Sequence, residues 1–158
     1  MFCKLRRAQP IAPVTSLQPR YSLVHREIED ETLRYCMSEG IGVIVYSPMA
    51  SGLLTGAMTL ERAARLAKDD WRRGHPDSTE PNLSHNLALV ERMRELANRH
   101  NRSVGEVAIA CTLRHPAVTG AIVGARNARQ AEGVMRAGEL HLTEDEVNEI
   151  EGFVETAA

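Results

Sequence analysis

The stretch VIVYSPMASGLLTG, residues 43–56, joins an apolar run to a loop of small residues, with Tyr46 at the junction. In parallel α/β proteins, ligands bind beyond the carboxyl ends of the strands. An aromatic ring at such an end can stack on a flat ligand, and a loop of small residues lets backbone N–H groups approach a phosphate closely. Ser47 and Ser51 add hydroxyl donors. The alternative interpretation is that Tyr46 caps the core and the loop is only a turn.

A second stretch with potential chemistry is IVGARNARQ, residues 122–130. A strand is expected to end here, Gly124 permits close approach of a ligand, and Asn127 is expected to open a helix. A helix N-terminus with Arg126 beside it is suited to a phosphate dianion. The alternative is an ordinary strand-to-helix turn with a solvated arginine. Two such strand ends in succession favour a phosphate-bearing ligand more than either does alone.

The other polar and aromatic candidates carry weaker signals. Trp71, between Asp70 and Arg72, could cover a ligand, but packing within its own loop is the plainer interpretation. The histidines show no metal-ligand spacing and no HExxH motif, so we predict no metal site. We expect them to lie on the surface or in loops: His25, His75, His85, His100, His115 and His141.

Composition sets the class of protein. A chain of 158 residues suffices for one domain, and a net charge of −2 gives no electrostatic case for nucleic acid or an acidic membrane. No apolar run approaches the roughly 18 residues of a membrane span, and MFCKLRRAQP lacks the apolar segment of a secretory signal. Three widely spaced cysteines without a CxxC motif fit free thiols in a reducing cytoplasm. Two of them, Cys36 and Cys111, lie in apolar helical contexts and are expected in the core.

The first third of the chain predicts a βαβ unit. Residues 11–17 are expected to form a short strand, and residues 29–38 a helix that buries Leu33, Cys36 and Met37. The unbroken apolar run of residues 41–47 is typical of a parallel strand covered on both faces. The crossover should be right-handed.

The remainder predicts further helices and one more strand. Residues 59–68 and 85–99 have helical character, whereas 69–83 is polar, contains two prolines and reads as a long loop, which in a compact domain is often functional. A short strand is expected around residues 121–123. Capping boxes are predicted to open helices at residues 103–106, 127–130 and 143–146. The last helix should bury Val147, Ile150 and Val154. Three strands, each followed by helix, make an α/β fold with parallel pairing.

Three stretches, in this order, resemble the aldo/keto reductase family. SLQPRYSLVHRE resembles the end of that family's sixth strand, GIGVIVYSPMASGLLTG its seventh strand and loop, and GAIVGARNARQAEGV its eighth strand and following helix. The resemblance runs from about Ile11 onward. It implies a partial (β/α)8 TIM barrel made of about the last three βα units, with residues 1–158 as a single partial domain and residues 1–10 as the remnant of a preceding helix.

The resemblance also implies a cofactor, NADP(H), and the residues that hold it. Gln18 would hydrogen-bond the nicotinamide carboxamide, and Tyr46 would stack on the nicotinamide ring. The pyrophosphate path would be lined by Ser47, Met49, Ser51, Gly52 and Leu53. The 2′-phosphate and the adenine ribose would be surrounded by Gly124, Ala125, Arg126 and Gln130. The family often has Glu-Asn where this chain has Gly133 and Val134, so its adenine contacts are expected to differ.

One departure from the family bears on activity. The family's catalytic Asp, Tyr, Lys and His lie on its second to fourth strands, and none has a matching position here. Tyr21, Tyr35 and Tyr46 are not candidates for the catalytic tyrosine, so the sequence predicts no catalytic residue. A whole barrel takes roughly 250 residues. Three parallel strands cannot close one, and an edge and an apolar face would be left open.

Three hypotheses follow for function. The chain is the cofactor-binding, carboxyl-terminal half of an aldo/keto reductase, silent alone, whose complete enzyme transfers hydride between NADPH and a carbonyl. Alternatively it is a non-catalytic dinucleotide-binding or interaction module, or it is a non-functional remnant. Expected partners are the dinucleotide and either a chain that supplies the missing barrel half or a second copy of this chain.

Overall fold

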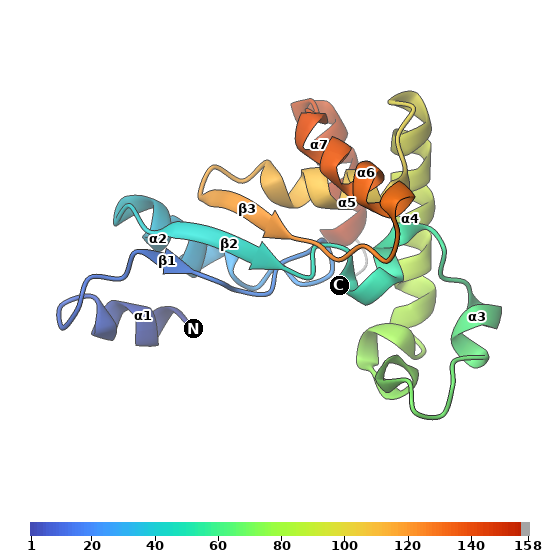
Figure 1. Cartoon of the computed structure of the whole chain (residues 1–158), viewed down its shortest axis with the longest axis horizontal. Coiled ribbons are helices and arrows are strands. Elements are labelled where there is room, and N and C mark those ends of the chain that lie inside the picture. The colour runs from blue at the N-terminus through green and yellow to red at the C-terminus, as the bar shows by residue number, and fades with distance from the viewer. Residues whose placement is uncertain (156–158) are drawn as a thin grey trace.

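The computed structural model describes residues 1–155, with side chains described up to Phe153. Within that range a parallel sheet of three strands runs through the molecule (Figure 1), in the order β1 (Ser16–Leu17), β2 (Gly42–Tyr46) and β3 (Val118–Ile122). The predicted α/β architecture with parallel pairing is therefore confirmed. The first strand is shorter than expected because only two residues pair with β2.

The covered face of the sheet packs against α1 (Phe2–Ala8) and α2 (Arg34–Ser38), which follows a π-helical turn, η1 (Glu29–Leu33). Val43 and Val45 are fully buried there, in a cluster with Leu5, Tyr21, Ile28, Leu33, Cys36, Ile41 and Ala117. Burial of Leu33 and Cys36 was expected from the helical spacing. The expectation for Met37 was wrong: it is 55% exposed, because it lies one residue beyond Cys36 and turns away from the sheet.

The larger core cluster lies beyond the carboxyl ends of the strands. It is formed by the turn η2 (Ala50–Thr55) and by α4 (Asn82–Arg99), α5 (Val104–Leu113) and α7 (Glu144–Glu155). In Figure 1, α5 lies behind β3, and α4 crosses the end of the sheet. The predicted helical stripe is buried as expected: Leu89, Val90, Met93, Leu96 and Ala97. In α7, Ile150 is buried and Val147 half-buried, while the side chain of Val154 lies outside the described residues.

Two of the three predicted capping boxes are confirmed. Ser103 Oγ accepts from the Glu106 N–H while the Glu106 carboxylate accepts from the Ser103 N–H, at 3.2 and 2.8 Å. The same reciprocal pair joins Thr143 and Glu146.

The third box is half formed, at the start of α6 (Ala128–Arg136). Asn127 Oδ1 accepts from the Gln130 N–H at 2.9 Å, as predicted. Gln130 Oε1, however, accepts from the Arg126 N–H at 2.8 Å rather than from Asn127. The long amide side chain reaches one residue further back than a box requires.

The segment predicted as a long loop is more ordered than expected. After α3 (Leu60–Ala64), residues 71–78 form two 3-10 turns, η3 (Trp71–Gly74) and η4 (Pro76–Ser78), and α4 already begins at Asn82. Asp70 caps the first turn by accepting from the Arg72 N–H. A further 3-10 turn, η5 (Ala137–Glu139), follows α6.

The opposite face of the sheet is open within the described chain. Ile44, Tyr46 and Ile122 are 39%, 40% and 44% exposed. The prediction from the apolar run, that β2 is covered on both faces, is therefore wrong for this chain, whereas the open apolar face expected of three strands from a barrel is confirmed. Side chains alternate along a strand, so Val43 and Val45 enter the core while Ile44 and Tyr46 point the other way.

Candidate functional site

The carboxyl ends of the three strands meet at one edge of the sheet. Tyr46 pairs with Ile122 on β3, and on the other side its N–H donates to the Pro19 carbonyl at 3.0 Å. Its own carbonyl accepts from the Tyr21 N–H at 3.2 Å. Arg20 is therefore the register neighbour of Tyr46 on one side and Ile122 on the other, with Gln18 two residues before Arg20 and Gly124 two residues after Ile122.

The loop after β2 carries an unusual backbone. Ala50, Ser51 and Gly52 have consecutive φ values of 46°, 56° and 94°, and Ser47 has 58°. Residues other than glycine rarely take this left-handed conformation, which costs on the order of 1–3 kcal/mol and gathers at functional sites. Gly52 takes this conformation freely because it lacks a Cβ, whereas Ser47, Ala50 and Ser51 take it at a cost.

Packing holds this strained loop in place. Leu53 and Leu54 are buried in the larger core, and the Gly56 carbonyl accepts from Arg94 Nη2 at 3.0 Å. Gly56 itself has φ 78°, and a Cβ there would lie 3.0 Å from Val104 Cγ2. Leu53 therefore serves as an anchor for the loop, and Met49 packs beside it while half-buried.

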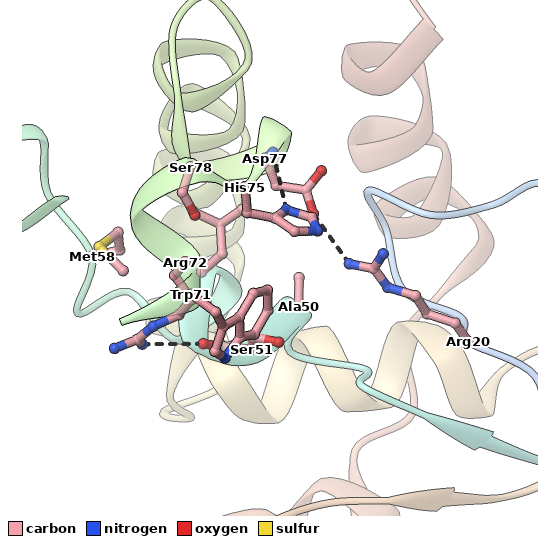
Figure 2. A pocket seen from close by; sticks show the side chains of 10 residues that line it. Arg20, Ala50, Ser51, Met58, Trp71, Arg72, His75, Asp77 and Ser78 are labelled. Carbon is pink, nitrogen blue, oxygen red and sulfur yellow. Dashed lines mark hydrogen bonds and ion pairs between the residues drawn. The ribbon is translucent and has the colours of Figure 1, made fainter. Parts of the chain in front are cut away.

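A cleft lies between this loop and the segment 71–78 (Figure 2). Arg72 reaches across it, with Nη1 3.4 Å from the Ser51 carbonyl. The ring of Trp71 stands beside Ser51 and Ala50 and is 61% exposed. The cleft is lined by Arg20, Ala50, Ser51, Leu53, Met58, Trp71, Arg72, His75, Asp77 and Ser78.

Two arginines line the cleft, and each is paired with an aspartate: Arg72 with Asp70, and Arg20 with Asp77. Arg72 forms a two-point pair with Asp70, from Nε at 2.9 Å and from Nη2 at 2.6 Å. These hydrogen bonds, with a small contribution from the charge of Arg126, hold the pKa of Asp70 down to about 2. The Asp70 carboxylate therefore holds the Arg72 guanidinium in place beside the Ser51 loop.

The loop after β3 is the more accessible part of the site. Gly124, Ala125, Arg126 and Gln130 are all exposed. The Gln130 side chain is engaged in holding the turn through the Arg126 N–H. The Arg126 guanidinium forms no hydrogen bond within the described residues, as a phosphate ligand would need.

The structure brings the predicted residues together in two groups. Those from Ser47 to Leu53 share one loop, and of these Ser51 and Leu53 line the cleft; Gln18 and Tyr46 are exposed at the adjoining strand ends. Residues 124–130 form a separate, exposed turn. Trp71 packs edge to face against His75 within its own loop, as the plainer interpretation expects, while 61% of the residue stays exposed.

Sequence reasoning missed Arg20, Arg72, His75 and Asp77. The signal available was the long segment 69–83, where an aromatic residue stands next to two arginines. Nothing local showed that its Asp77 would face Arg20 from the end of β1.

Two further observations concern other classes of site. Among the described residues, no group of three His, Cys, Asp or Glu side chains is placed to hold a metal ion. No helix within residues 1–155 combines the length and apolar character that crossing a bilayer requires.

Comparison with known proteins identifies the class. The model of the aldo/keto reductase family matches residues 3–155, and the chain belongs to this family. It is 30% identical to probable aldo-keto reductase 1 from Glycine max and 31% identical to aldo-keto reductase YhdN from Bacillus subtilis (strain 168), each over 92% of this chain. It spans less than half the length of these relatives, 41% and 44%.

A solved structure likewise matches nearly all of this chain but less than half of its own length. The glycerol dehydrogenase AKR11B4 from Gluconobacter oxydans superimposes with a TM-score of 0.87 and 29% sequence identity. The match covers 97% of this chain and 46% of that one. Almost everything described here is thus similar to part of a larger oxidoreductase.

Proposed function

We propose that this chain is the cofactor-binding, carboxyl-terminal half of an NADP(H)-dependent aldo/keto reductase, formed by the last three βα units of its barrel. The observation that carries the proposal is the meeting of three strand ends around the exposed Tyr46 ring, with Arg72 against the loop after β2 and Arg126 in the exposed loop after β3. A ring stacks on a flat nicotinamide, and two guanidiniums suit phosphate groups.

Different residues of the site bind different parts of the dinucleotide. Tyr46 and Gln18 take the nicotinamide, the loop from Ser47 to Leu53 takes the pyrophosphate, and the turn at Arg126 takes the 2′-phosphate. The bound cofactor supplies the hydride in the complete enzyme, for transfer to or from a carbonyl carbon. This chain contributes binding and orientation, and it is silent without the remaining strands. Its three free thiols, two of them buried, support a cytoplasmic location.

Titration of the purified chain with NADPH tests the cofactor role. Saturable quenching of the fluorescence of Trp71, the single tryptophan, is expected. Tyr46→Ala should raise the dissociation constant for NADPH up to about tenfold, because aromatic stacking contributes on the order of 1 kcal/mol. Ile44→Ala is the matched control, because it removes an apolar side chain from the same face of the same strand. Absence of binding, or equal weakening by both variants, would contradict the proposal.

We also propose that the open face is covered by a polypeptide equivalent to the unmatched part of the relatives. Ile44, Tyr46 and Ile122 present an apolar surface, and β1 and β3 have no outer neighbour among the described residues. Parallel strands from the rest of a barrel would pair with both edges, whereas a second copy related by a two-fold axis would bring an antiparallel strand to β3.

Mixing experiments test this partner. The probe is the part of Bacillus subtilis YhdN that the alignment leaves unmatched, which by the proposal carries the catalytic groups. NADPH-dependent reduction of a carbonyl should arise only in the mixture. Carbonyl reduction by this chain alone would contradict the proposal that it is inactive without the remaining strands. NADPH binding without association would favour the alternative, a non-catalytic dinucleotide-binding module, and a chain that neither binds nor unfolds cooperatively would favour a remnant.

A further inference from the structure

The carboxylate of Asp77 is the centre of a cluster that joins distant parts of the chain. It accepts from Arg20 Nη2 at 3.1 Å and lies 2.7 Å from His25 Nε2, while the Asp77 backbone N–H donates to His75 Nδ1 at 3.3 Å. Its side chain is only 17% exposed. The Asp77 carbonyl also accepts from Asn86 Nδ2 on α4 at 3.0 Å. One residue therefore ties η4 to the segment after β1 and to α4.

The cluster continues toward the cleft through His75. The His75 ring contacts Trp71 edge to face, with 5.2 Å between ring centroids. Trp71 is followed by Arg72, whose Nη1 points at the Ser51 carbonyl. Figure 2 shows this sequence of contacts, from Arg20 through Asp77 and His75 to the side chains at Ser51.

The rest of the segment is weakly held. Trp71 is mostly exposed, and neither η3 nor η4 contributes a buried residue. A segment without buried apolar side chains must be ordered by polar contacts. If the free protein leaves the segment partly disordered, ordering it on binding reduces the affinity for the ligand. Asp77 supplies the polar contacts that span the greatest distance in sequence.

We infer that Asp77 is a positioning residue for the dinucleotide: it fixes residues 71–77 so that Trp71 and Arg72 stand against the Ser51 loop before the ligand arrives. The inference rests on the proposed function, because that loop is the proposed pyrophosphate path. Asp77 touches no part of the ligand in this arrangement and acts through His75 and the turn.

The test compares Asp77→Asn with Asp30→Asn in the full chain. Asp30→Asn makes the same charge change at a side chain of η1 that is 91% exposed, pairs with Arg34 and does not line the cleft. Hydrogen exchange of the amides of residues 71–78 should accelerate at least about tenfold in Asp77→Asn alone, as a local opening predicts. The dissociation constant for NADPH should rise about five- to tenfold, the cost of ordering one or two side chains.

Adenosine 2′-monophosphate separates positioning from general destabilisation. It reaches only the Arg126 turn, so its affinity should stay within about twofold in Asp77→Asn. His25→Ala is a milder second variant, since His25 does not line the cleft but contacts Asp77, and it should shift exchange and NADPH affinity in the same direction by a smaller factor.

Each result has a definite meaning. Faster exchange with unchanged NADPH affinity would overturn the positioning role and leave the proposed function standing. Equal weakening of NADPH and adenosine 2′-monophosphate would also overturn it. Failure of the unsubstituted chain to bind NADPH would overturn both proposals at once.

Discussion

The two faces of β2 meet different surroundings although both are apolar. Val43 and Val45 are fully buried against α2 and its neighbours, whereas Ile44 and Tyr46, which alternate with them, are 39% and 40% exposed. One face completes a core within this chain. The other carries an exposed aromatic ring at the carboxyl end of the strand, which the proposed function assigns to the nicotinamide. The contrast teaches that an apolar strand face predicts burial only when something in the chain covers it.

The sharpest test of this contrast replaces adjacent residues by aspartate. Val45→Asp puts an unpaired charge in the core and should lower the free energy of unfolding by about 3–5 kcal/mol or prevent folding. Ile44→Asp, one residue earlier, should cost no more than about 1 kcal/mol. Urea unfolding followed by far-UV circular dichroism measures both. Similar losses for the two variants would mean that the open face is buried in solution.

A second test extends the comparison to the loops that follow β2 and β3. Gly56→Ala should destabilise the chain by about 1–3 kcal/mol, because φ is 78° and the new Cβ would meet Val104. Gly124→Ala should change stability by less than about 0.5 kcal/mol, because nothing lies within 4 Å of a Cβ there. Thermal unfolding measures the loss of stability in both variants. A loss at Gly124 larger than about 0.5 kcal/mol would show that the exposed turn is packed against other residues.

The smallest expected effect is a pH dependence of folding stability caused by His115, which precedes β3. Burial lowers the pKa of His115, whose Nδ1 accepts from the Ala117 N–H at 3.2 Å just before β3. The unfolded chain then binds a proton more readily than the folded chain, so stability should fall as the pH drops below about 6.5. His115→Asn keeps an acceptor without titrating and should reduce the slope between pH 7 and 5. An unchanged slope of stability against pH would show that groups other than His115 cause the pH dependence.

Local pattern was enough for some elements. The stripe from Leu89 to Ala97 and the boxes at Ser103 and Thr143 are correct because helix periodicity and capping depend on residues three or four apart. Residues Ser47 to Leu53 could be predicted to share one loop because that loop follows the strand directly, while their role in binding stays a prediction. The family resemblance, confirmed by the match over residues 3–155, added the expected roles of these residues.

What local pattern missed depends on distant partners. The turns at 71–78 are held by Asp77, which pairs with Arg20 and His25, and no periodicity connects residues so far apart. The left-handed backbone of Ser47 and Ala50 could not be read from residue type, because neither is glycine. It is stabilised by the burial of Leu53 and Leu54 in the adjoining core.

The sequence by itself determined the class of fold, the parallel strands, the helix starts and the loop that follows Tyr46, since each depends on short-range spacing. Only the tertiary structure decided which face of β2 is covered, how the segment 71–78 folds and that Arg72 stands against Ser51. These depend on contacts between residues far apart in the chain, whose free energy is gained only once the elements pack together.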